Sequence, residues 1–249
     1  MMSSTNAGMA PQHPLSPECM LIRDGAYWNR EGATQLITGN LDTAIDRLMD
    51  GLETLSLAGG FHASPAIANA YATRSFPFDR QSPSSPLRSL AFQHPLPPQL
   101  PSNDCDDGSF FVYSNPFIFH PVTVDTPEYA TNCTAVVLFN LALAWHQRGR
   151  RADSRALYRA RSLYEMSLAL VASMSCREAC ANLNVAATNN KAHVHFEVSD
   201  VGDAKNTLHA LLTILGTNKS SPPPFGELEI EKFYMNILHL NGSTLAGAA

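Results

Sequence analysis

The residues of this sequence that could carry chemistry are few. His193 and His195 form an HVH motif, and Cys176 and Cys180 form CREAC. Side chains two apart on a helix point about 200° away from each other, so the histidines cannot grip one ion, and only one of them should face the core. The cysteines lie one helical turn apart without further ligands nearby. We therefore expect no metal site and interpret these cysteines as buried small hydrophobic residues.

Motifs typical of catalysis are missing from the sequence. It contains no glycine-rich phosphate loop, no nucleophile elbow and no helix with paired carboxylates. We therefore expect no catalytic residues and no cofactor, and an α-helical enzyme or small-ligand carrier is the less favoured alternative. An enclosed pocket with converging histidine and acidic groups would favour that alternative, whereas an open groove would favour peptide binding.

The composition is that of a globular protein with a mild excess of acidic residues. Of its 249 residues 45% are hydrophobic and 16% are charged, and the net charge is −5. The sequence has no basic stripe for nucleic acid and no apolar run of about 18 residues for a membrane. It lacks a secretory signal pattern, and its five cysteines are scattered and odd in number, which favours reduced thiols. We expect a cytoplasmic or nuclear protein without nucleic-acid or membrane partners.

Helical periodicity organises most of the chain. Residues 25–58, 134–172 and 177–216 each predict a pair of helices, and residues 226–241 predict a closing helix. The pairs are separated by glycine, asparagine and aspartate residues that typically end or begin helices, such as those in TGNLD. These stretches predict an all-α fold.

The remaining stretches are predicted to be irregular. Residues 1–24 are polar and contain prolines, which indicates a disordered tail, and residues 242–249 are predicted to be a loose tail. Residues 59–133 form an insertion whose proline-rich part excludes a continuous helix. Within it, residues 109–124 are aromatic and β-branched, which predicts a small extended or β piece.

The three helix pairs share an internal spacing between small residues. Two of the pairs place these residues twelve positions apart, and the second pair adds six positions. We assign this surplus to the turn RGRRADSR, because lengthening a loop costs little free energy. Small residues at these positions let helix axes approach closely. They are Gly32 and Ala44, Ala142 and Ala160, and Ala192 and Ala204.

This pattern resembles the tetratricopeptide repeat family over about 110 of the 249 residues. A large residue and a small one on the first helix are followed by a turn, then by Ala and a large residue on the second helix. The resemblance implies antiparallel helical hairpins stacked as a short solenoid. The matching residues are Trp28, Gly32, Ala44 and Leu48 in the first repeat, Leu141, Ala142, Ala160 and Tyr164 in the second, and Ala192, Ala204 and Leu208 in the third.

The resemblance also implies where a partner would bind. In this family the first helices of the hairpins line a concave groove, and asparagine side chains can both donate to and accept from an extended backbone. The predicted peptide-binding residues are Asn29, Arg30, Asn140, His146, Gln147, Asn190, His193 and Glu197.

We therefore expect a non-enzymatic protein–protein interaction scaffold that binds another polypeptide in this groove. One alternative is self-association through an unpaired helix face or through the aromatic segment FFVYSNPFIF. Another is that this segment fills the groove of its own chain. Ser82 and Ser85, each followed by Pro in the insertion, are candidate sites for a proline-directed kinase.

Overall fold

The computed structural model describes residues 15–59, 110–119, 127–151, 153–174, 180–217 and 225–242. Within these ranges the chain is helical except for short connections and residues 110–119, and no strand is present. The all-α prediction is thus confirmed, whereas the described part of the predicted β piece forms no strand. Ser82, Ser85 and Cys176 lie outside the described residues. The helices are α1 (Pro17–Ile37), α2 (Leu41–Leu57), α4 (Pro127–Arg150), α5 (Ser154–Ser173), α6 (Ala181–Glu197), α7 (Val201–Thr217) and α8 (Glu227–Gly242).

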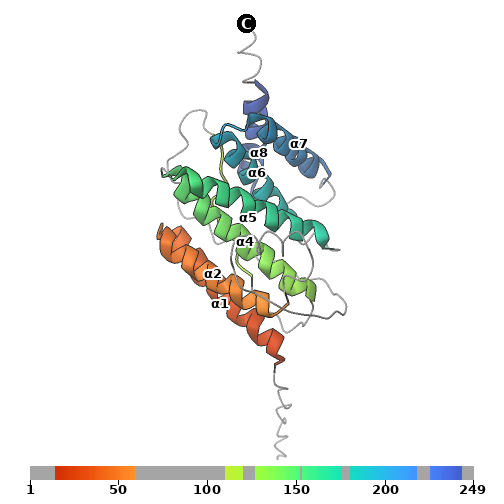
Figure 1. Cartoon of the computed structure of the whole chain (residues 1–249). Helices are drawn as coiled ribbons and strands as arrows, with labels where there is room; N and C mark the ends of the chain where they lie inside the picture. Colours follow the sequence, from red (N-terminus) through yellow and green to blue (C-terminus); the bar gives the residue numbers. More distant parts are fainter. Residues whose placement is uncertain are drawn as a thin grey trace, which may run out of the picture.

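The helices pack as neighbouring pairs, α1 with α2, α4 with α5, and α6 with α7 (Figure 1). Each second helix also contacts the first helix of the next pair, and α8 packs on α7. A hydrophobic core therefore runs from pair to pair. None of the described helices is long and apolar enough to cross a bilayer.

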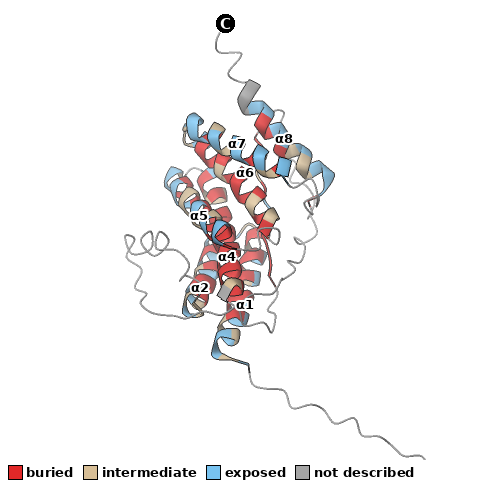
Figure 2. Ribbon diagram, turned by 90° about the vertical axis from the view of Figure 1, so that its right-hand side faces the viewer, coloured by how far each residue is buried: buried red, intermediate tan, exposed pale blue. Residues whose placement is uncertain are grey.

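Helices α4 and α6 lie in the interior, between the other helices (Figure 2). Every residue of α4 from Tyr129 to Ala144 is buried, so this part of the helix has no solvent-exposed face. The second helices are amphipathic instead, with Leu48, Tyr164 and Leu211 among their fully buried side chains. This layering decides which polar side chains of the first helices must find partners inside the protein.

Helix α1 begins earlier than the sequence indicates. It starts at Pro17, inside the stretch 1–24 that was predicted to be a disordered tail. The Ser16 hydroxyl accepts a hydrogen bond from the Cys19 N–H, and Pro17 occupies the first helical position, where its missing N–H is not needed. Ser16 and Pro17 therefore begin the helix. A prediction based only on the polarity of residues 1–24 misses this helix start.

The surplus of the second pair lies in its helices and not in its turn, so the assignment to the turn was wrong. All three pairs are joined by three residues, at 38–40, 151–153 and 198–200. Measured from the small residues of the repeat, α4 continues three residues further than α1 and α6, and α5 begins three residues earlier than α2 and α7. The added turns pack on each other where Leu157 covers Gly149, which explains why helix replaces loop.

A substitution at Gly149 tests this close approach. A Cβ atom added there would lie 2.5 Å from Leu157 Cδ2 and 3.1 Å from the Leu157 backbone nitrogen. We expect Gly149→Ala to lower the free energy of unfolding by about 1–3 kcal/mol in urea denaturation, although alanine favours helices. Gly216→Ala in α7 is the matched control, because no atom lies within 4 Å of its added Cβ, and it should leave stability unchanged or raise it by up to about 1 kcal/mol. Equal effects at both sites would contradict the packing argument.

Candidate functional site

Residues 110–119, the inner segment, lie against the first helices of the pairs and against α8 (Figure 1). The segment is not helical, yet most of its side chains are buried. Its aromatic rings pack in the core, with Tyr113 5.6 Å from Phe117 and 5.4 Å from Phe225 between ring centroids. The chain thus fills its inner face with part of its own insertion. The buried residues of the segment are Phe110, Tyr113, Pro116, Phe117, Ile118 and Phe119.

Asparagine side chains hold the backbone of the inner segment. The Phe117 N–H donates to Asn140 Oδ1 at 2.9 Å, and Asn140 Nδ2 donates back to the Phe117 carbonyl at 2.7 Å. Asn29 Nδ2 donates to the same carbonyl at 3.1 Å, and Asn29 Oδ1 accepts from Asn140 at 2.8 Å. Helices α1 and α4 therefore both bind the backbone of the same residue, Phe117.

Helices α6 and α8 repeat this arrangement further along the segment. Asn190 accepts from the Tyr113 N–H and donates to the Tyr113 carbonyl, both at 2.8 Å. Asn236 binds the N–H and the carbonyl of Phe111 in the same way, both at 2.7 Å, and Asn189 adds a bond of 2.9 Å to that carbonyl. Each first helix, and α8, thus supplies at least one asparagine. The asparagine groove is defined by Asn29, Asn140, Asn189, Asn190 and Asn236.

The asparagines of the groove bond to the backbone of the inner segment and not to its side chains. A side-chain amide offers a donor and an acceptor side by side, which matches the N–H and C=O of one extended residue. Phe111 and Tyr113 lie two positions apart, the spacing at which an extended chain presents its groups to the same side. Asparagine has a low helix propensity, and its amide is costly to bury without hydrogen-bond partners. The bonds to the inner segment supply those partners.

A chain of polar side chains connects the groove to the surface. Asn190 Nδ2 donates to Tyr164 Oη at 3.1 Å, and Tyr164 Oη lies 3.3 Å from His146 Nδ1. His146 Nε2 lies 2.8 Å from His193 Nδ1, and His193 Nε2 lies 3.3 Å from Glu197 Oε1. All of these residues are buried except Glu197, which is exposed on the last turn of α6.

One proton arrangement satisfies every bond of this chain. The Tyr164 hydroxyl donates to His146, the His146 Nε2–H donates to His193, and the His193 Nε2–H donates to Glu197. Both imidazoles are then neutral. A proton added to His193 Nδ1 would place two N–H groups against each other across the 2.8 Å contact. A proton added to His146 Nδ1 would remove the acceptor for the Tyr164 hydroxyl. The pair is therefore built to stay uncharged.

The electrostatics of the two histidines agree with this arrangement. Burial lowers the pKa of His146 well below its ordinary value, and it is lowered further by repulsion between protonated forms of His146 and His193 and by the Arg150 charge. Burial and the Arg150 charge lower the pKa of His193 to about 3. The contact between His193 and Glu197 is accordingly a hydrogen bond from a neutral ring at pH 7.

The structure brings together six of the eight sequence-predicted binding residues. Asn29, Asn140 and Asn190 contact the inner segment, while His146, His193 and Glu197 form the polar chain beside it. Arg30 is exposed and Gln147 is half-buried, and neither bonds to the segment.

Two members of the asparagine groove, Asn189 and Asn236, were not predicted from the sequence. An asparagine within an apolar helical stretch, as in MNIL, is the signal that could have found Asn236. Contrary to the expectation that only one of the two histidines faces the core, both are buried: His193 is 4% exposed, and His195 is 3% exposed and contacts Asp200.

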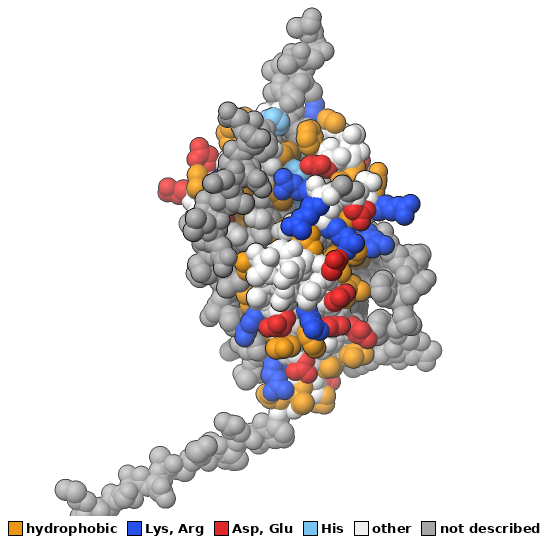
Figure 3. All heavy atoms as spheres, turned by 90° about the vertical axis from the view of Figure 1, so that its left-hand side faces the viewer, with side chains coloured by type: hydrophobic (Ala, Val, Ile, Leu, Met, Phe, Trp, Pro, Cys, Tyr) orange, Lys and Arg blue, Asp and Glu red, His pale blue; other side chains and the backbone are white. Residues whose placement is uncertain are grey.

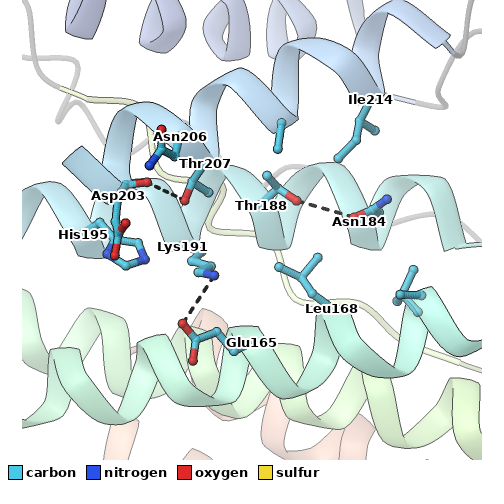
Figure 4. Close-up of a pocket in the computed structure, with 13 residues that line it drawn as sticks. Glu165, Leu168, Asn184, Thr188, Lys191, His195, Asp203, Asn206, Thr207 and Ile214 are labelled. Carbon is cyan, nitrogen blue, oxygen red and sulfur yellow. Dashed lines mark hydrogen bonds and ion pairs between the residues drawn. The ribbon is translucent and has the colours of Figure 1, made fainter. Parts of the chain in front are cut away.

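A second hollow, of about 590 Å³, lies between α5, α6 and α7 (Figure 4). Two of its charged groups pair with each other, Lys191 Nζ with Glu165 Oε1 at 3.3 Å. At one end the ligand atoms of His195, Asp200 and Asp203 lie within 4.8 Å of one another. The Asp200 carboxylate also caps α7 through the Asp203 N–H, so we assign no ion to this group. The hollow is open to solvent at its exposed Glu165 and Asp203.

Comparison with protein-family models, curated proteins and solved structures gives no match to this chain. The geometry of the asparagine groove is therefore the basis for assigning a function.

Proposed function

We propose that this protein is a non-enzymatic scaffold that binds an extended polypeptide in its asparagine groove. The observation that carries the proposal is the double hydrogen bond from Asn190 to the N–H and C=O of Tyr113, which Asn140 and Asn236 repeat at two other residues. Such bonds reach backbone groups, so they select an extended main chain, while the space around the segment's rings selects the side chains. In the structure the protein's own inner segment occupies this place.

The proposal includes a tetratricopeptide-like arrangement of the hairpins. Three-residue turns, close approaches at Gly32 and Gly149, and first helices that line the groove support it. A Cβ atom at Gly32 would lie 2.5 Å from Leu48 Cγ, the large residue of the matching second helix. The described part of the chain ends with α8, which contributes Asn236 to the groove as a first helix would.

The inner segment defines what a partner must offer. An incoming polypeptide has to replace the backbone bonds to the asparagines and fill the space of Tyr113 and Phe117, both of which are packed against Phe139. Burying a side chain of this size contributes about 1.5–3 kcal/mol, so a partner without aromatic residues would not displace the segment. The partner is therefore an extended polypeptide with aromatic side chains.

Peptide exchange tests the proposal. Protease sites introduced within residues 60–109 and 120–126 would allow the inner segment to be cut from the folded chain and challenged with a labelled peptide of residues 109–120. We expect the labelled peptide to enter the cut protein, with weaker binding when Asn140 and Asn190 are both replaced by alanine. A scrambled peptide of the same composition is the control. A cut protein that unfolds when the segment leaves, or that never exchanges it, would show that the segment is core and would refute the proposal.

Self-association is the second candidate, because α8 exposes apolar residues on its outer side. Leu228 is 65% exposed, Met235 57% and Leu238 62%. These positions, seven and three residues apart, lie on one face of the helix. Sedimentation of the wild type and of Met235→Glu across a concentration series would reveal a dimer and its loss, whereas a monomer throughout would exclude this candidate.

A further inference from the structure

Arginines are concentrated at one end of the second helical pair. Six of them lie between residues 148 and 161, in a chain that has 17 Lys and Arg residues in total and a net charge of −5. The segment that carries them is the end of α4, the turn at 151–153 and the first part of α5, which together form the arginine tip. The six are Arg148, Arg150, Arg151, Arg155, Arg159 and Arg161.

Half of these arginines are explained by contacts within the protein. Arg148 pairs with Asp42 and with Asp153, and Arg161 pairs with Asp200 at 4.0 Å. Arg148 and Arg159 cover the ring of Trp145, with 5.3 and 4.6 Å from guanidinium carbon to ring centroid. The indole therefore holds the Arg159 guanidinium in place at the surface.

The other three arginines are exposed and have no ion-pair partner within the described ranges. They are Arg150, Arg151 and Arg155. Their positive charge is not compensated locally, and Arg150 contributes to the lowered pKa values of both buried histidines. Unpaired like charges in one place repel each other, so an anion placed among them would be bound favourably.

The shape of the tip makes these side chains accessible. Counted from the small residues of the repeat, α4 and α5 each have three more helical residues at this end than the helices of the other pairs, which is about 4.5 Å of helix. On the face drawn in Figure 3, several Lys and Arg side chains gather in the upper half, with some acidic side chains beside them, and both signs are mixed below.

We propose that the arginine tip is a docking surface for an acidic polypeptide. Arginine binds carboxylates through two parallel hydrogen bonds, and all six basic residues of the tip are arginine and not lysine. A long polyanion such as nucleic acid fits less well, because exposed Asp46 and Glu53 on the neighbouring α2 would repel its extension beyond the tip. A short run of Glu or Asp matches the size of the patch.

The tip is a different surface from the asparagine groove, so the two proposals can fail separately. A labelled oligo-glutamate peptide would be titrated into the full-length protein at low ionic strength, with fluorescence anisotropy as the readout. We expect saturable binding that weakens about tenfold in the Arg151→Gln/Arg155→Gln variant, because each exposed charge pair contributes a few-fold to affinity. Both residues are exposed, so the variant should unfold at the same temperature as the wild type.

A second variant separates the tip from net charge alone. Arg23→Gln/Lys205→Gln removes the same charge from α1 and α7, and we expect it to bind the peptide as the wild type does. Absence of binding to the wild type, or equal weakening in both variants, would overturn the proposal. Tighter binding of a single-stranded oligonucleotide of equal charge than of oligo-glutamate would overturn the choice of a polypeptide partner.

Discussion

Asn190→Ala is expected to lower the free energy of unfolding by about 3–5 kcal/mol, measured by urea denaturation at pH 7.5. The substitution leaves the N–H and the carbonyl of Tyr113 buried without partners and removes the donor to Tyr164 Oη. Each buried polar group that loses its partner costs about 1–3 kcal/mol, since water cannot replace it. Asn190 is fully buried, so relaxation to solvent is not available.

Two further variants separate this effect from a change in helix propensity. Asn206→Ala on the exposed side of α7 makes the same chemical change and should shift stability by less than about 0.5 kcal/mol. Asn190→Asp keeps the acceptor for the Tyr113 N–H but places a carboxylate oxygen against the Tyr113 carbonyl, and it should be as damaging as alanine. If Asn190→Ala were no worse than Asn206→Ala, the asparagine would not hold the inner segment.

Acidification from pH 7.5 to 5.5 is expected to lower the free energy of unfolding by about 2–3 kcal/mol. The pKa values of His146 and His193 lie below 6.5 in the folded protein, that of His193 at about 3, whereas both return to about 6.5 on unfolding. Above pH 6.5 neither state binds the protons, and the stability is fully present. As pH falls below 6.5 only the unfolded chain takes up protons, so stability falls by up to about 1.4 kcal/mol per pH unit for each histidine.

Urea denaturation at several pH values checks this expectation. His193→Gln should make the stability less dependent on pH between 7.5 and 5.5, because one of the two linked protons is removed. His209→Gln changes an exposed histidine and should leave the dependence unaltered. The lowered pKa of Asp200 affects stability only near and below about pH 4, outside this window. A protein whose stability was constant or rose on acidification would show that the histidine pair is charged when folded.

The inner segment covers the face that the repeat pattern predicts to be an open groove. Predicted groove residues such as Asn140 and Asn190 do line an inner face, but they are fully buried by the protein's own chain. Binding of a separate polypeptide therefore requires displacement of the segment, which the exchange experiment measures. The arginine tip requires no such displacement, since its unpaired side chains are already exposed.

The helices and their pairing could be predicted from the sequence, because these features are local. Apolar periodicity placed α2, α5 and α7 within a few residues, and the small residues at Gly32 and Ala44 marked where α1 and α2 approach. Where the prediction was wrong, as at Pro17 and in the second turn, a local cap or a Gly–Leu contact extended the helix.

The sequence left open whether the aromatic segment fills the groove of its own chain, and the tertiary structure decided that it does, as it also decided the shape of the tip. Asn29 and Asn140 are 111 positions apart when they bond, and Asn29 is 88 positions from Phe117. Hydrogen bonds between residues so far apart produce no periodic pattern in the sequence. They depend on the path by which the insertion packs back against the helices. The sequence by itself therefore determined an all-α chain of paired helices with polar residues on its inner helices. Only packing determined that those residues would hold the protein's own backbone.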